Sequence, residues 1–163
     1  MRKVTQSSHL AEEGERPTVR VSGLLVKDQR LLLVRQQRGG EAYWLLPGGG
    51  VEFGESLSGA LEREMLEELG LTAVAGAPLA LVESVSPDMK SYAKHVLHVI
   101  LELRTAAGQP AAQLAPGDPA VVEAGFFARQ ELSGLVIRPP IVDFLDEYLR
   151  APTFLMTYLG QRW

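Results

Sequence analysis

The sequence contains no cysteine. A disulfide framework, a thiolate metal site and a thiol nucleophile are therefore excluded, and the absence agrees with a cytoplasmic protein. Long hydrophobic runs are missing too, because no apolar stretch approaches the roughly 20 residues that a membrane-spanning helix needs. Arg2 and Lys3 lie near the N-terminus, but the apolar core of a signal peptide does not follow them. We therefore expect a cytoplasmic protein without a membrane partner.

An excess of basic charge is also missing. Lys and Arg number 16 against 20 Asp and Glu, which gives a formal net charge of −4 at pH 7. A nucleic-acid-binding surface needs a basic face that releases counterions from phosphates, so this balance argues against a nucleic-acid partner. An acidic protein can still bind a small nucleotide locally, through a metal ion and a few arginines. Arg20, Arg35 and Arg38 are the arginines close to the glycine-rich segment.

The length and the residue patterns predict one domain with an extension at each end. A chain of 163 residues suits a single domain. Residues 1–17 are polar and aperiodic, so we expect a loose N-terminal arm, and the domain itself should cover residues 18–150. Residues 151–163 are too apolar for a free tail. We expect this tail to pack on the domain or on a second copy of the chain in a homodimer.

Strands dominate the expected secondary structure. Apolar and β-branched residues predict strands over residues 18–27, 30–37, 43–46, 73–85 (as one strand or two), 95–103 and 120–127. The first two should form a hairpin around Asp28 and Gln29, and the glycine-rich segment before residue 51 should be a loop. Helices are expected over residues 56–69 and after Pro139. Composition and periodicity thus indicate an α+β protein.

The segment from residue 49 to residue 71 carries a cluster of acidic residues. On a helix that advances about 100° per residue, Glu64, Glu67 and Glu68 point within about one quadrant. Like charges at these spacings destabilise a helix by a few tenths of a kcal/mol per pair, so a positive group is expected beside them. Mg²⁺ and Mn²⁺ prefer oxygen ligands and leave positions for water and substrate phosphates. The pattern therefore predicts a site for one of these cations.

This segment resembles the signature box of the Nudix (MutT-like) hydrolases. The box, written G-x5-E-x7-R-E-apolar-x-E-E-x-G-apolar, is matched by Gly49, Glu55, Arg63, Glu64, Met65, Glu67, Glu68, Gly70 and Leu71. The run from Trp44 to Gly49 and the segment Gly125–Phe127 also resemble the family. The resemblance implies an α/β/α sandwich with a mixed β-sheet. It also implies a Mg²⁺- or Mn²⁺-dependent enzyme that hydrolyses a pyrophosphate bond in a nucleoside diphosphate joined to another group.

The resemblance assigns a role to each polar residue of the box. The implied metal ligands are the carbonyl group of Gly49 and the carboxylates of Glu64, Glu67 and Glu68. Arg63 is expected to orient a glutamate and so to serve catalysis. Glu55 is expected to anchor the loop to the helix, and Gly70 to end the helix in a left-handed conformation.

The general base has two alternatives. Glu64 lies within the cluster, but many relatives use a glutamate from a downstream loop. The nearest downstream candidate is Glu123, followed by Asp118. A frequent family pattern has a glutamate three residues before Glu123, where this chain has Ala120.

The substrate contacts are expected upstream of the box, at Arg35, Arg38 and Trp44. Trp44 either stacks on a base or packs under the glycine loop. Pro87 lies where a proline resembles the branch of the family that hydrolyses ADP-ribose, which favours ADP-ribose or a related nucleotide sugar. Nucleoside triphosphates and dinucleoside polyphosphates are the alternatives. A regulatory domain that binds a nucleotide without hydrolysing it is the alternative from another class.

Overall fold

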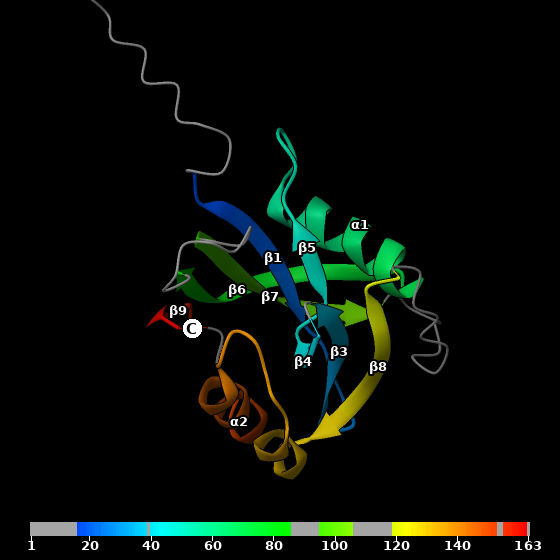
Figure 1. Cartoon of the computed structure of the whole chain (residues 1–163), viewed down its shortest axis with the longest axis vertical. Helices are drawn as coiled ribbons and strands as arrows, with labels where there is room; N and C mark the ends of the chain where they lie inside the picture. Colours follow the sequence, from blue (N-terminus) through cyan, green and yellow to red (C-terminus); the bar gives the residue numbers. More distant parts are fainter. Residues whose placement is uncertain (1–15, 39, 86–94, 106–118, 153–154, 163) are drawn as a thin grey trace, which may run out of the picture.

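The computed structural model describes residues 16–38, 40–85, 95–105, 119–152 and 155–162. Pro87, Asp118 and nearly all of the expected N-terminal arm lie outside these residues, so the predictions made for them are not addressed by the structure. Helices α1 and α2 lie on opposite sides of the strands (Figure 1). None of the helices in the described ranges is long and apolar enough to cross a membrane.

The strands form two sheets. In chain order the elements are β1 (Thr18–Leu24), β2 (Val26–Lys27), β3 (Arg30–Arg38), β4 (Glu41–Leu45), β5 (Gly48–Gly50), α1 (Leu57–Leu69), β6 (Ala73–Val85), β7 (His95–Thr105), β8 (Val121–Ala128), the 3₁₀ helix η1 (Arg129–Gly134), α2 (Val142–Arg150) and β9 (Thr157–Gln161). One sheet has the order β5-β1-β7-β6-β9, and in the other β3 pairs with β2, β4 and β8. The β1–β7 and β6–β9 pairs are parallel and the rest are antiparallel. The predicted mixed α+β sandwich is therefore confirmed.

The predicted hairpin of residues 18–27 with residues 30–37 is only partly right. The chain leaves the five-stranded sheet after β1. Of the expected first strand, only the part that forms β2 pairs with β3. β1 cannot pair with β3 because β5 and β7 already occupy both of its edges. The predicted turn is present: Asp28 and Gln29 have φ angles of 50° and 58°, and two such residues in succession suit a two-residue hairpin.

The glycine-rich segment was expected to be a loop, and that prediction is wrong. Residues 48–50 form strand β5, which pairs antiparallel with β1, with Val21 opposite Gly49. Glycine has a low intrinsic preference for strands, so local sequence does not reveal this element. The pairing with β1 forms it, and it brings the glycine backbone beside α1.

Helix α1 follows its local signals closely. Ser56 is the N-cap, and its hydroxyl group accepts a hydrogen bond of 3.0 Å from the N–H of Gly59. Gly70 ends the helix with a φ of 63°, and its N–H bonds to the carbonyl of Leu66. The predicted limits of the helix are thereby confirmed.

Two hydrophobic cores lie on the two faces of the strands. Alternate residues of a strand point to opposite faces, so Val34 of β3 joins the α1-side core, with Leu61 and Met65, while Leu33 joins the α2-side core, with Leu145. Helix α2 begins at Val142, slightly later than the two prolines suggested. The α1-side core holds α1 against β5, β6 and β1.

Part of the expected apolar tail is the edge strand β9. It pairs parallel with β6, with Tyr158 opposite Leu81. Leu159 packs against the α2-side core, whereas Leu155 and Met156 are exposed.

Candidate active site

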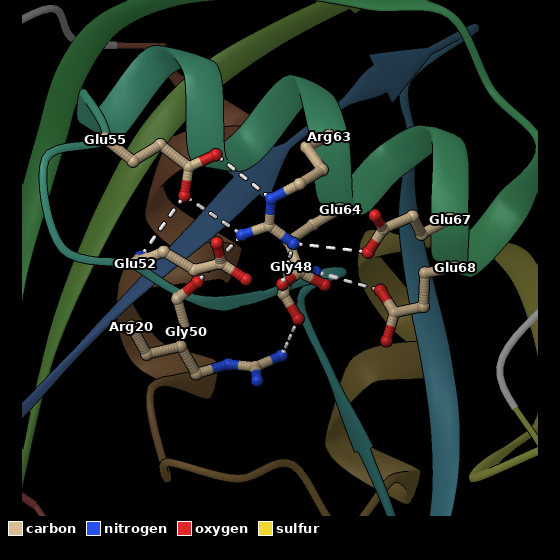
Figure 2. Close-up of polar contacts among 9 residues, drawn as sticks. All are labelled: Arg20, Gly48, Gly50, Glu52, Glu55, Arg63, Glu64, Glu67 and Glu68. Atoms are coloured by element: carbon tan, nitrogen blue, oxygen red, sulfur yellow. Dashed lines mark hydrogen bonds and ion pairs between the residues drawn. The ribbon is translucent and has the colours of Figure 1, made fainter.

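Arg63 of α1 lies among three carboxylates, those of Glu64 and Glu67 on the same helix and that of Glu55 in the loop before it (Figure 2). Its Nε and Nη2 atoms each lie 3.0 Å from an oxygen of Glu55, and its Nη1 atom lies 2.8 Å from Glu64 and 3.2 Å from Glu67. Glu55 and Glu64 raise the pKa of Arg63, and the Arg63 hydrogen bonds lower the pKa of Glu55. The positive group expected beside the glutamates is thus supplied in part by the helix itself.

Glu55 also connects the loop before α1 to the helix. One of its oxygens accepts a hydrogen bond of 3.2 Å from the N–H of Glu52, and Arg63 donates to the carbonyl of Gly50. The loop between β5 and α1 is therefore held at two points by the Glu55–Arg63 pair. Glu55 thus contacts the loop backbone and the helix side chain Arg63, and its anchoring role remains a prediction.

Glu68 points away from the arginine and into the protein. Only 3% of its surface is exposed. Its Oε2 atom accepts a hydrogen bond of 3.0 Å from the N–H of Gly48, and its Oε1 atom accepts one of 3.4 Å from the amide of Gln36. Gln36 was not predicted from the sequence, because its partner lies on another element and no local pattern marks it.

The glycines of β5 allow the strand to approach α1 closely. A methyl group at Gly49 would overlap the Glu64 carboxylate. Gly48 has a φ of 138°, and it donates its N–H to Glu68 while its carbonyl accepts a hydrogen bond from Arg20 (Figure 2). These positions require glycine because any side chain would collide with a neighbour.

The donor set fits a hard divalent cation, although the three glutamates do not converge on one point. Within the described ranges, no three Asp, Glu, His or Cys side chains are grouped closely enough to hold a metal ion. Glu64 and Glu67 nevertheless share one nitrogen of Arg63, so a positive group already lies between their carboxylates. Carboxylate and carbonyl oxygens are the ligands that Mg²⁺ and Mn²⁺ prefer.

Glu123 lies on the other face of its sheet. It is directly opposite Arg35 in the β3–β8 pair, and the two side chains form an ion pair of 3.3 Å. Gln36, the next residue of β3, points to the opposite face and contacts Glu68. The structure therefore brings Glu123 to Arg35 and not to the α1 carboxylates.

Trp44 and Arg38 are the other two residues that were expected to bind substrate, and the structure describes the side chain of Trp44 alone. Trp44 is partly buried beside the α2-side core, and its ring meets that of Phe127 edge-on with 4.5 Å between centroids. Its backbone bonds to Val136 and Arg138. Arg38 pairs with Glu41 at the end of β3, and its side chain lies outside the described part of the chain.

A small pocket opens beside the Arg20 contact with Gly48. We call it the Arg20 pocket; its lining is Arg20, Ser22, Leu45, Leu46, His98, Ile100, Arg138, Pro139 and Ile141. Burial, with a smaller effect of Arg20, lowers the pKa of His98 to about 4, and its imidazole lies 3.1 Å from the Ser84 hydroxyl. Sequence reasoning missed this pocket. The available signal was the polar pair Arg20 and Ser22, which flanks the buried Val21 in β1.

Comparison with known proteins decides the family. The model of the NUDIX domain matches residues 14–151. The chain belongs to the Nudix family. This assignment covers the elements from β1 to α2 and the whole box, and β9 lies beyond it.

The relatives of this Nudix chain act on different substrates. It is 33% identical over 120 residues to the ADP-ribose pyrophosphatase of Methanocaldococcus jannaschii, which covers 73% of this chain and 66% of that protein. It is also 33% identical over 145 residues to the m7GpppN-mRNA hydrolase NUDT17 of Danio rerio, covering 82% of this chain and 47% of that protein. The chain thus spans slightly less than two thirds of the first of these relatives and about half of the second.

Solved structures agree on the fold. A NUDIX hydrolase from Nitrosomonas europaea superposes with a TM-score of 0.68 at 25% identity, over 83% of this chain and 90% of that one. An ADP-ribose pyrophosphatase from Streptococcus suis superposes with a TM-score of 0.64 at 20% identity, over 88% and 99%.

Proposed function

We propose that this Nudix protein hydrolyses a pyrophosphate bond in a nucleoside diphosphate linked to another group, with Mg²⁺ or Mn²⁺ as cofactor. The observation that carries the proposal is the arrangement of Glu64, Glu67 and Glu68 on α1 against the glycine backbone of β5. Arg63 pairs with Glu64 and Glu67 and so offsets the repulsion between their like charges.

Each box residue has a defined task in this proposal. Glu64, Glu67, Glu68 and the carbonyl of Gly49 would hold the cation. A divalent cation, when bound, neutralises the pyrophosphate oxygens and stabilises the leaving phosphate. Arg63 holds the Oε1 atom of Glu64 in place, and the Oε2 atom of Glu64 would accept the proton of the attacking water.

Glu64 is the better candidate for the base because of where Glu123 lies. Glu123 pairs with Arg35 on the face of its sheet opposite Gln36 and Glu68. We propose that Arg35 contributes to the substrate side of the site and that Glu123 holds its guanidinium in position.

We propose ADP-ribose or a related nucleotide sugar as the substrate. Two observations support it: a relative that covers most of this chain is named an ADP-ribose pyrophosphatase, and the Arg20 pocket offers Arg20, Ser22 and Arg138 as hydrogen-bond donors beside the glycine strand. Nucleoside triphosphates and dinucleoside polyphosphates are the second candidate. The capped-mRNA relative makes RNA 5′ ends a necessary comparison, although the net charge disfavours them.

The test is a panel of substrates incubated with Mg²⁺ or Mn²⁺, with the products identified by chromatography. The panel holds ADP-ribose, a UDP-sugar, a deoxynucleoside triphosphate, a dinucleoside tetraphosphate and a capped RNA. We expect AMP and ribose 5-phosphate from ADP-ribose as the fastest reaction. A protein that binds a nucleotide but hydrolyses none of the panel would instead be a regulatory domain.

Variants of the box test the site itself. Glu67→Gln and Glu68→Gln keep the side-chain volume and remove the charge, so each should lower turnover by about two orders of magnitude or more. Glu62→Gln on the same helix is the matched control, because it keeps an oxygen that accepts the hydrogen bond from the N–H of Ala75. Near wild-type turnover in both box variants would show that the metal assignment is wrong.

We also propose that the protein works in the cytoplasm and as a homodimer. The absence of cysteine supports the first proposal. The exposed side chains of Leu155, Met156 and Tyr158 at the edge of the five-stranded sheet support the second. The mass in solution, measured by light scattering, tests the homodimer.

A further inference from the structure

Gln36 is a buried polar residue that none of the proposed roles uses. Only 5% of its surface is exposed, and it lies on β3 two residues beyond Val34 of the α1-side core. Its side-chain amide donates to Glu68 over 3.4 Å. Burying an amide in an apolar environment is unfavourable unless the amide is hydrogen-bonded, so this contact decides whether Gln36 is tolerated there.

Glu68 is held from both sheets at once. The N–H of Gly48 on β5 donates to its Oε2 atom, and Gln36 on β3 donates to its Oε1 atom. The first donor belongs to the five-stranded sheet and the second to the other sheet. Because both oxygens are held by donors from different elements, the carboxylate cannot rotate without losing one of these bonds.

The direction of Glu68 therefore depends on a residue outside the box. A backbone N–H alone fixes one oxygen and leaves the plane of the carboxylate to be set by its second partner. Gln36 supplies a second partner, and its amide donor carries no charge. An arginine at this position would orient the carboxylate but would also compete with a bound cation.

We propose that Gln36 is a positioning residue that fixes the orientation of Glu68 for cation binding. The inference rests on the proposed function, since it concerns the cation that Glu68 would help to hold. Gln36 acts through Glu68 and does not contact the substrate. Its loss should therefore weaken cation affinity and lower kcat while leaving KM for the nucleotide nearly unchanged.

The experiment measures Mn²⁺ binding to the full chain by electron paramagnetic resonance of the free ion. The variants are Gln36→Met, which removes the donor at similar length, and Gln37→Met, a matched control at the next, exposed position of β3. We expect the Mn²⁺ dissociation constant to rise about 10- to 100-fold in Gln36→Met, the range typical for residues that orient metal ligands. It should change less than about twofold in Gln37→Met.

A second variant keeps the test decisive if Gln36→Met does not fold. Gln36→Asn retains the amide but retracts the donor by one methylene, so it should show the same loss of affinity. Melting temperatures measured without added cation distinguish a positioning role from a purely structural one. A variant that melts earlier but binds Mn²⁺ as tightly as the wild type has lost only stability. That result would overturn the inference. Failure of the wild type to bind Mn²⁺ would overturn the proposed function, and the inference with it. Wild-type binding with unchanged affinity in the Gln36 variants would overturn the inference alone.

Discussion

At the scale of single residues, the candidate site depends on the absence of side chains as much as on their presence. Gly48 donates its N–H to the carboxylate of Glu68, and its carbonyl accepts a hydrogen bond from the guanidinium of Arg20. Gly49 brings the backbone against Glu64. The anionic cluster and the Arg20 pocket therefore lie on either side of one short stretch of backbone.

A methyl group on this backbone should disable the site. In Gly49→Ala the added carbon would overlap the Glu64 carboxylate, so either the strand or the helix has to move. We expect a loss of about 1–3 kcal/mol in the free energy of unfolding, typical of overpacking, together with a large loss of turnover. Gly50→Ala is the control, because nothing lies within 4 Å of a Cβ atom at that position. Equal stability and equal turnover in the two variants would contradict the close approach. Urea unfolding and a turnover assay measure both quantities.

At the scale of helices and strands, the sequence predicts those elements whose ends and buried faces are determined by residues within the element itself. Helix α1 was predictable because Ser56 and Gly70 mark its two ends and because apolar residues such as Leu61, Met65 and Leu69 recur at helical spacing on its buried face. The box residues were predictable because their spacing is fixed by that helix. Strand β5 was not predictable, and neither was the separation of β1 from the hairpin formed by β2 and β3. Both depend on pairing with strands that are distant in sequence. The contact of Gln36 with Glu68 was missed for the same reason.

The edge strand β9 gives a prediction at this scale. Truncation after Arg150 removes β9, exposes the edge of β6 and takes Leu159 away from the α2-side core. An uncovered edge strand is prone to pair with other chains, so the truncated protein should melt earlier and should aggregate or become monomeric. Leu66→Gln, at a side chain of α1 that is 59% exposed and lies outside β9 and the tail, should melt as the wild type does. A truncated protein with unchanged melting and unchanged mass in solution would refute a packed tail.

At the scale of the whole molecule, stability should depend on pH through His98. Its pKa in the folded protein is lowered to about 4, mainly by burial, from an ordinary value near 6.5. The unfolded chain therefore binds a proton that the folded chain does not, and stability falls as the pH decreases from about 6.5 towards 4. The loss attributable to this residue is at most about 3 kcal/mol.

Substitution of the histidine tests this dependence. His98→Gln, which keeps a hydrogen-bonding group for Ser84, should unfold in urea with a weaker dependence on pH between about 6.5 and 4. His95→Gln, at the start of the same strand, is the control and should retain the wild-type dependence. The same slope for His98→Gln and the wild type would assign the pH dependence to other groups.

The parallel pairing of β1 with β7 also has a consequence for synthesis of the chain. Thr18 lies opposite Val96, so β1 leaves the ribosome well before its partner β7 has been translated. The β2–β3–β4 region, in contrast, pairs within one short stretch of sequence and can form at once. During this interval the edge of β1 that later pairs with β7 leaves its backbone N–H and C=O groups unpaired, so other chains or a chaperone can bind there. Contacts between residues so distant in sequence also make a slow folding step.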